Sequence, residues 1–244
     1  MSSIRKATGS AFLTTPTKRS VLRMETSALF GEQTLLVRRL VAQGVRDVKV
    51  LEAFRKVPRE QFVPAHLREE AEADRALDIG CGQTISQPFV VARMTEALEL
   101  AETARVLEVG TGSGYQAAIL ATLLPPPNLV RTIEIIPALA EAARDLLARL
   151  GYGNVEVKVG DGALGWPRAA PFDAILVAAA PPEVPQTLLD QLAIGGRLVI
   201  PIGPTAGNQQ LELWTRASAK EFERRRLFAV RFVPLVGEGG GGIH

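Results

Sequence analysis

Short apolar runs alternate with helix-like patterns through the second half of the chain. The apolar runs predict buried strands over residues 105–109, 129–133, 155–159, 172–179 and 197–202. Helical patterns separate them, at residues 116–124, 138–150 and 185–192. Regular alternation of strand and helix predicts an α/β fold with a doubly wound, mainly parallel sheet, in which ligands bind at the carboxyl ends of the strands.

The pattern changes after the last of these strands. Residues 211–216 and 227–233 are two further apolar runs, joined by a polar link. Two runs so connected predict an antiparallel hairpin at the C-terminal end of the sheet.

Before the sheet the spacing is mostly helical. Apolar residues recur at helical intervals over residues 25–67, including one helix over 48–57 that Pro58 ends. Residues 78–88 are polar and contain glycine, which predicts a loop and a candidate substrate wall. Pro88 suits the first turn of a helix that runs to about residue 100. We therefore expect an accessory helical layer followed by one functional loop.

A loop with three glycines follows the first predicted strand. Gly110, Gly112 and Gly114 have the spacing G-x-G-x-G, and Tyr115 stands where a dinucleotide-binding loop has its third glycine. The loop looks like the S-adenosylmethionine loop of the Rossmann-like methyltransferases. A tight strand-to-helix turn that binds no ligand is the alternative that the glycines alone leave open.

Three acidic residues stand at the ends of successive predicted strands: Glu108, Glu134 and Asp161. The carboxyl ends of neighbouring parallel strands surround one crevice, so we expect these side chains to lie near one another. Glu134 is placed to accept from ribose hydroxyls, which S-adenosylmethionine and NAD both carry, so it does not choose between them. Asp161 is expected near an adenine amino group, and Glu108 near a cationic methionine end.

Composition restricts the class of protein further. The chain has 244 residues, 47% of them hydrophobic, and a net charge of only +2, which gives no electrostatic footprint for nucleic acid or a membrane. Its single cysteine excludes an internal disulfide and suits a reducing compartment, and its two histidines are too few for a zinc site. We expect a cytoplasmic protein that needs no metal.

The same patterns predict a single globular domain. Residues 1–20 are polar and lack an apolar segment, so we expect a flexible leader, and residues 237–244 are expected to form a flexible glycine-rich tail. Between them, residues 21–236 form one domain, with the helices and substrate loop in 21–100 and the cofactor-binding sheet in 101–236.

The stretch Gly82-Gln-Thr-Ile-Ser-Gln-Pro88 adds a far more specific signal than the glycines do. With it in view, the chain resembles the protein-L-isoaspartate (D-aspartate) O-methyltransferase family. Asp78 and Cys81 depart from the residues usual in that family, and the leader lies outside the resemblance. The matching stretches are residues 59–68, 82–88, 94–96, 106–117, 160–162, 165–166, 170–175, 177–181, 195–201 and 230–235.

The resemblance implies an enzyme that methylates the free carboxylate of L-isoaspartyl residues in age-damaged proteins and peptides; whether it accepts D-aspartyl residues stays open. The ester would then collapse to a succinimide that hydrolyses partly to normal aspartate. Ser86 matches the family's active-site residue, and we expect a monomer. The S-adenosylmethionine site would comprise Thr84, Ile85, Ser86, Glu108, Gly110, Thr111, Gly112, Ser113, Gly114, Glu134, Asp161, Gly162 and Gln209. The substrate peptide would contact Gln83, Thr84, Ser86, Ala179, Ala180 and Val233.

Other interpretations compete with this one. Ser86 could instead cap the helix that begins at Pro88, a purely structural role. A nucleic-acid methyltransferase is a rival, although Ala178-Ala-Ala-Pro-Pro182 has no polar residue ahead of its prolines to accept from an amine. A small-molecule O-methyltransferase leaves the Gln-Thr-Ile-Ser loop unexplained. A nucleotide-binding regulator without catalysis, or a nicotinamide oxidoreductase disfavoured by Tyr115, complete the alternatives.

Overall fold

The computed structural model describes residues 34–204 and 207–237. The predicted leader, the start of the helical layer and most of the predicted tail lie outside these residues. The described N-terminal part begins with helices α2 (Leu35–Ala42) and α3 (Val48–Lys56). Each has a side-chain cap: the Thr34 hydroxyl accepts from the Val37 N–H, and the Asp47 carboxylate accepts from the N–H groups of Lys49 and Val50.

Two 3₁₀ helices, η1 (Arg59–Phe62) and η2 (Ala65–Glu70), continue from α3. They follow Pro58, which lacks the N–H that would continue the α-helix. This confirms the predicted helix over 48–57 and its end at proline.

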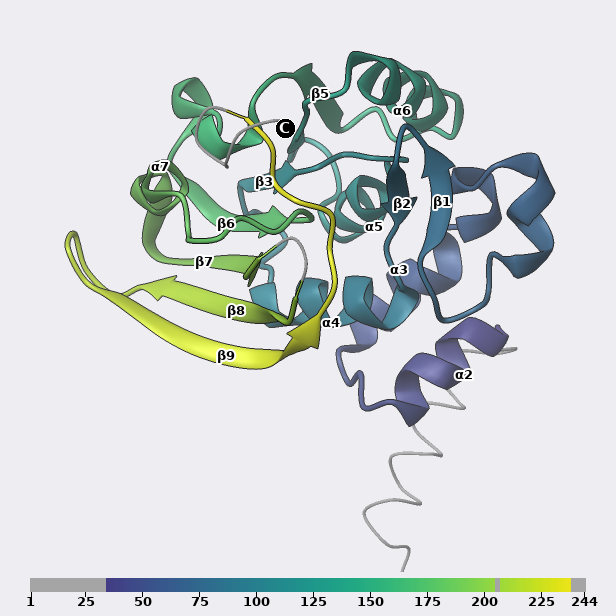
Figure 1. The fold of residues 1–244 in the computed structure, drawn as a ribbon, viewed down its shortest axis with the longest axis horizontal. Helices are drawn as coiled ribbons and strands as arrows, with labels where there is room; N and C mark the ends of the chain where they lie inside the picture. Colours follow the sequence, from purple (N-terminus) through teal and green to yellow (C-terminus); the bar gives the residue numbers. More distant parts are fainter. Residues whose placement is uncertain (1–33, 205–206, 238–244) are drawn as a thin grey trace, which may run out of the picture. The chain divides into compact units, whose positions relative to one another are not determined.

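The centre of the fold is a seven-stranded sheet with the order β5-β4-β3-β6-β7-β8-β9. The first five of these strands are parallel, and β8 and β9 are antiparallel to their neighbours. The chain adds β4 and β5 on one side of β3 and then β6 and β7 on its other side. The strand order therefore reverses at β3, which is the topological switch point of the sheet (Figure 1). The strands are β3 (Val106–Val109), β4 (Val130–Glu134), β5 (Val155–Val159), β6 (Phe172–Val177), β7 (Leu192–Ile202), β8 (Gln209–Arg216) and β9 (Phe222–Val230).

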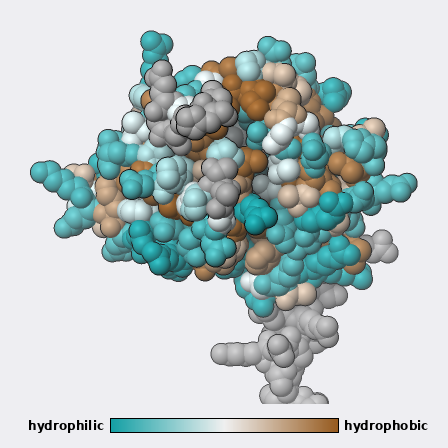
Figure 2. Space-filling view, viewed as in Figure 1, coloured by the Kyte–Doolittle hydropathy of each residue, from teal (hydrophilic) through white to brown (hydrophobic). Residues whose placement is uncertain are grey.

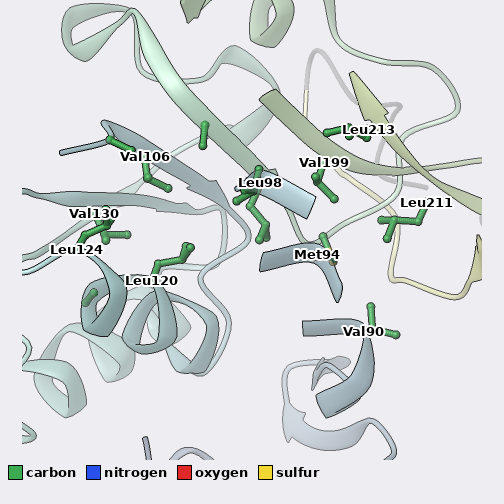
Figure 3. Close-up of a cluster of buried hydrophobic side chains, with 14 residues drawn as sticks. Val90, Met94, Leu98, Val106, Leu120, Leu124, Val130, Val199, Leu211 and Leu213 are labelled. Carbon is green, nitrogen blue, oxygen red and sulfur yellow. The ribbon is translucent and has the colours of Figure 1, made fainter. Parts of the chain in front are cut away.

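Helices cover both faces of this sheet, as predicted for a doubly wound fold. Leu120 and Leu124 at the end of α5, Met94 and Leu98 of α4, and Val106 of β3 belong to one buried cluster between these helices and the sheet (Figure 3). A second buried cluster contains Leu188 and Leu189 of α7 together with strand side chains that point to the other face of the sheet, such as Leu107. The remaining helices are α4 (Pro88–Leu98), α5 (Tyr115–Leu123), α6 (Pro137–Arg149), α7 (Gln186–Asp190), η3 (Gly162–Leu164) and η4 (Pro167–Ala169).

The predicted loop at 78–88 was wrong in one respect, because most of it is a small hairpin. Strand β1 (Leu77–Gly80) pairs antiparallel with β2 (Gln83–Ile85), with Leu77 opposite the buried Ile85. The turn runs through Gly80, Cys81 and Gly82, all with positive φ. Strands this short carry too few side chains to show alternation in the sequence.

Two strand boundaries also differ from the prediction. Strand β7 begins at Leu192 and continues through Gly195 and Gly196, whereas the predicted strand began at residue 197. A Cβ at Gly196 would lie 2.8 Å from the Ala193 carbonyl oxygen, so this close approach requires glycine within the strand. Strand β9 begins at Phe222, because its first half is an exposed edge rich in arginine that carries no apolar signal.

No helix in the described part of the chain is long and apolar enough to cross a membrane. On the face shown in Figure 2, hydrophilic side chains predominate and apolar residues are visible between them.

Candidate functional site

The glycine loop turns the chain from the buried strand β3 into helix α5. Gly110, Gly112 and Gly114 all have positive φ, at 93°, 53° and 86°. At Gly110 and Gly112 an added Cβ would meet only ordinary contacts, near 3.5 Å, so these glycines are required by backbone conformation rather than by crowding. The loop follows β3, so it lies at the switch point where ligands of such sheets bind.

The loop directs most of its main-chain donors to the protein itself. The N–H groups of Gly110 and Thr111 donate to the Ile133 carbonyl at 2.8 and 3.3 Å. The Gly112 N–H donates to the Glu134 carboxylate at 2.9 Å. A loop whose donors are already used can let a ligand approach closely, but it has little capacity to bind phosphate oxygens.

Glu134 lies at the end of β4 and joins the glycine loop to the next turn. Its side chain is buried, and its second oxygen accepts from the Ile136 N–H at 3.0 Å. Each carboxylate oxygen accepts from one N–H group and retains a lone pair for a further donor. Glu134 therefore stays available to hydroxyl groups in the pocket, whose wall it forms.

Asp161 and Gly162 follow strand β5. The Asp161 carboxylate caps η3 by accepting from the Ala163 N–H at 2.8 Å. A Cβ at Gly162 would lie 2.3 Å from Val109 Cγ1, so only glycine permits this approach to β3. A Cβ at Gly237 would lie 2.4 Å from the Asp161 carboxylate, which places the C-terminal segment directly against this acid. Gly162 lines the pocket, and Asp161 stands beside it.

Glu108 lies within the sheet, behind the pocket wall. Its side chain is fully buried in β3, and neither carboxylate oxygen has a hydrogen-bond partner among the described residues. Burial raises the pKa of Glu108 to about 8; the nearby Thr132 hydroxyl opposes this rise and the charge of Glu134 adds to it. A positive charge bound in the pocket would favour the ionised form of Glu108.

The second wall of the pocket comes from the β1–β2 hairpin, which lies beside the sheet in Figure 1. Gln83, Thr84, Ile85 and Ser86 all line the pocket. The structure contradicts the helix-cap alternative for Ser86: the N-cap position of α4 is Gln87, and the Asp74 carboxylate accepts from the Phe89 N–H at 2.9 Å. Ser86 is half-buried at this wall and does not cap α4.

The C-terminal segment, residues 231–237, closes the pocket from the other side. After β9 this yellow segment runs back along the ends of the central strands (Figure 1). It is fastened to the loop after β6, because the Ala180 N–H donates to the Val233 carbonyl at 2.8 Å and the Leu235 N–H donates to the Ala180 carbonyl at 3.0 Å. Val233, Pro234, Leu235 and Val236 then line the pocket.

Gln209 holds this segment rather than lining the pocket. Its side-chain amide accepts from the Phe232 N–H at 2.6 Å and donates to the Phe232 carbonyl at 3.0 Å. The residue is buried at the start of β8. Of the substrate residues predicted from the sequence, Ala179 lines the pocket, whereas Ala180 has both main-chain groups committed to the C-terminal segment.

The structure thus brings most of the predicted site residues into one pocket. Those that line it are Gln83, Thr84, Ile85, Ser86, Gly110, Thr111, Gly112, Ser113, Glu134, Gly162, Ala179 and Val233. Glu108, Gly114, Asp161, Ala180 and Gln209 lie behind or beside the wall. Sequence reasoning did not single out Arg59 and Asp74, because nothing local marks a buried arginine or a capping carboxylate 15 positions before the N–H from which it accepts.

Within the described residues there is no group of three or more His, Cys, Asp or Glu side chains that could hold a metal ion. The side chains that line the pocket include the Glu134 carboxylate, hydroxyl groups of the hairpin and of the glycine loop, and apolar residues.

Comparison with known proteins shows the family to which the chain belongs. Residues 31–240 match the family model described as protein-L-isoaspartate(D-aspartate) O-methyltransferase. The chain is 57% identical over 201 residues to protein-L-isoaspartate O-methyltransferase 2 of Marinobacter nauticus, covering 82% of this chain and 90% of that protein. It is 54% identical to protein-L-isoaspartate O-methyltransferase of Myxococcus xanthus, covering 82% of this chain and 93% of that protein.

Solved structures agree with these matches. A protein-L-isoaspartate O-methyltransferase superposes with a TM-score of 0.76 at 32% identity, covering 84% of this chain and 66% of that chain. A protein of Plasmodium falciparum described as a putative member of the same group, in complex with S-adenosyl-L-homocysteine, gives a TM-score of 0.72 at 27% identity, covering 82% of this chain and 96% of that chain. The chain belongs to the protein-L-isoaspartate(D-aspartate) O-methyltransferase family.

Proposed function

We propose that this chain transfers a methyl group from S-adenosylmethionine to the free carboxylate of L-isoaspartyl residues in damaged proteins and peptides, and so begins repair through a succinimide. One observation carries the proposal. Residues 83–86 of the hairpin and the glycine loop with Glu134 line one pocket, so a peptide carboxylate at the hairpin can meet a cofactor at the glycine loop.

The residues present fit S-adenosylmethionine better than a cofactor that carries phosphates. The donors of Gly110, Thr111 and Gly112 are used within the protein, and the carboxylate of Glu134 faces the loop. A negative group at this position repels phosphate but accepts from ribose hydroxyls. Glu134 would hold the ribose, Asp161 and Gly162 the adenine, and Glu108 would act from beneath the loop on the cationic end.

When bound, the sulfonium cofactor supplies a methyl group that is open to nucleophilic attack. The attacking carboxylate needs no general base, because a free carboxyl group with a pKa near roughly 4 is already ionised at neutral pH. We assign Ser86 the role of orienting this carboxylate through its hydroxyl. Ile85, Leu176 and Val233 make this part of the pocket apolar, which limits the water around the two opposite charges.

The substrate peptide would lie between the hairpin and the C-terminal segment. Gln83, Thr84 and Ser86 would contact it from the hairpin, and Ala179 and Val233, which line the same pocket, from the loop after β6 and the C-terminal segment. Ala180 serves this wall by fastening the C-terminal segment, since its own main-chain groups are already paired. We also propose that the protein acts as a monomer in the cytoplasm; light scattering of the purified chain and fractionation of cells test these two statements.

The test is methyl transfer from labelled S-adenosylmethionine to a matched pair of peptides, one with L-isoaspartate and one with L-aspartate at the same position. We expect base-labile label on the first peptide only. A third peptide with D-aspartate shows whether that residue is also accepted. If neither of the first two peptides is labelled while the cofactor still binds, the acceptor is a different molecule or the protein is not a catalyst.

A further inference from the structure

Arg59, the first residue of the short helix η1, is a buried cation that contacts the main chain at both ends of the β1–β2 hairpin. Arg59 is 2% exposed, and its guanidinium donates to three main-chain carbonyls: Ala71 at 2.5 Å, Arg75 at 3.2 Å and Ser86 at 2.9 Å. Ala71 and Arg75 precede β1, whereas Ser86 follows β2. One side chain therefore ties together the two ends of the hairpin.

The same guanidinium also contacts the cofactor side of the site. Its central carbon lies 5.8 Å from the centre of the Tyr115 ring, within the range of a cation–π interaction. Tyr115 is the first residue of α5, immediately after the glycine loop. Its ring is buried and is held edge-on by Phe54 and Phe62, at centroid distances of 6.0 and 5.4 Å. The two phenylalanines therefore hold in place the Tyr115 ring that the Arg59 guanidinium contacts.

We propose that Arg59 is a positioning residue: it fastens both ends of the β1–β2 hairpin to the helix that follows the glycine loop, and thereby sets Ser86 against the cofactor pocket. This inference rests on the proposed function for its catalytic readout. Its structural part, the anchoring of the hairpin, stands on the contacts of Arg59 alone.

Folding alone does not explain a cation at this position. No carboxylate lies within ion-pair distance of Arg59 in residues 34–204 and 207–237; its direct partners are carbonyl dipoles and a ring face, and Asp74 acts on its charge only from a longer distance. Burial of a charge without a counter-ion costs free energy, and an apolar side chain of similar size usually stabilises a core better. What an apolar side chain lacks is a set of donors that reaches the main chain on both sides of a hairpin.

The geometry requires arginine rather than lysine. Nη2 donates both to Arg75, before β1, and to Ser86, after β2, so this nitrogen joins the two ends of the hairpin, and Nη1 adds a contact to Ala71 on the side before β1. A lysine Nζ would lie near the position of the guanidinium carbon, one bond short of both Nη atoms, so it cannot reach the three carbonyls together. Arg59→Lys keeps the charge but loses the bridge, and Arg59→Met removes both while retaining much of the apolar stem.

The experiment compares these two variants with Arg46→Lys and Arg46→Met. Arg46 is a matched control, because it also donates to main-chain carbonyls, of Val41 and Val45, but at the exposed end of α2. Three quantities are measured on the full chain: kcat and KM for an L-isoaspartyl peptide, the Kd of S-adenosylhomocysteine by calorimetry, and amide hydrogen exchange over residues 77–86.

We expect both Arg59 variants to lower kcat/KM for the peptide by about 100-fold, as a misplacement of about 1 Å at a reacting group can do. The Kd of S-adenosylhomocysteine should stay within about threefold of the wild-type value, because the glycine loop and Glu134 are untouched. Exchange at residues 77–86 should become about tenfold faster or more, and that at β3 should not change. The Arg46 variants should match the wild type in all three measurements.

Unchanged exchange over residues 77–86 in folded Arg59 variants would overturn the proposal, and so would an equal loss of cofactor and peptide affinity. Failure of both Arg59 variants to fold would also overturn it, because Arg59 would then serve the fold as a whole. A wild-type protein inactive on isoaspartyl peptides would refute the proposed function but not the anchoring, which the exchange measurement tests without any reaction.

Discussion

The two walls of the pocket are built in different ways. The cofactor wall is made of main chain at the ends of parallel strands, where the N–H groups of Gly110, Thr111 and Gly112 are held by Ile133 and Glu134. The substrate wall consists of a two-stranded hairpin and a C-terminal segment with little regular structure. A few buried side chains hold it, above all Arg59 at the hairpin and Gln209 at the C-terminal segment.

This difference shows how one pocket can combine a rigid part with an adjustable one. Strand β3 is buried on all sides and paired with β4 and β6, so opening it requires disruption of the sheet. The hairpin and the C-terminal segment can open locally by the loss of a few polar contacts, which costs less than global unfolding. A cofactor of constant shape suits the first wall, and protein substrates of varied sequence suit the second.

The largest effect should come from Ser86→Ala, which alters the substrate wall alone. We expect kcat for an L-isoaspartyl peptide to fall by about 100-fold, because the carboxylate loses the hydroxyl that orients it. The melting temperature and the Kd of S-adenosylhomocysteine should not change, since Asp74 rather than Ser86 caps α4. Steady-state kinetics and calorimetry measure these quantities, with Ser218→Ala on the distant β8–β9 turn as the control. Normal turnover together with a lower melting temperature would show that Ser86 is a structural residue.

Glu134→Gln tests the cofactor wall in the same manner. An amide has only one oxygen, so it cannot accept from both the Gly112 and Ile136 N–H groups and also from a ribose hydroxyl. We expect the Kd of S-adenosylhomocysteine to rise about tenfold or more, since a hydrogen bond to a charged group contributes about 1.5–3 kcal/mol. At saturating cofactor the KM for the peptide should stay normal. Glu141→Gln on the exposed side of α6 serves as the control, and unchanged cofactor affinity would refute the role given to Glu134.

A smaller effect is expected for Gln209→Met, which removes both hydrogen bonds to Phe232. The C-terminal segment then loses an anchor, and the part-buried N–H and carbonyl of Phe232 lose their partner, at a cost of about 1 kcal/mol. We expect a lower free energy of unfolding in urea and a peptide KM that is about fivefold higher. Gln210→Met, at the next position of the same strand, is the matched control. Equal behaviour of the two variants would show that Gln209 does not hold the segment.

The smallest predicted effect concerns pH and Glu108. The folded protein keeps a proton on Glu108 up to about pH 8, whereas the unfolded chain releases it near 4.5. The folded state therefore binds more protons between these values, so Glu108 makes the protein less stable as pH rises through this window. Glu108→Gln should melt at a higher temperature than the wild type at pH 8, with the difference shrinking toward pH 5. A constant difference across this range would contradict a protonated Glu108.

The sequence predicted the cofactor wall better than the substrate wall, for a physical reason. Apolar runs such as 105–109 and glycine spacing are local signals, and parallel topology follows from their order, so the crevice with Glu134 could be placed in advance. The hairpin at Leu77–Ile85 was missed because its strands are too short to show a period. Arg59 and the contact of Gln209 with Phe232 were missed because they depend on residues far apart in the chain.

Site residues divide in the same way. The sequence motifs marked both Gly162 and Ser86 as site residues. In the structure Gly162 is needed because the chain passes close to Val109, and Ser86 lines the pocket. Ala180 and Gln209 were predicted to contact ligands, but their groups in the structure are directed at the C-terminal segment. A motif indicates that a residue belongs to the site, while only the fold shows whether it contacts the ligand or holds the wall.

The most direct test of this account is native-state hydrogen exchange on the wild-type protein without ligands. If the cofactor wall is part of the sheet and the substrate wall rests on a few polar anchors, amides of residues 106–112 should exchange about tenfold or more slowly than those of residues 83–86 and 231–236. Equal protection of the two walls, or faster exchange at the glycine loop, would show that the pocket is a single rigid unit and would contradict the division drawn between them.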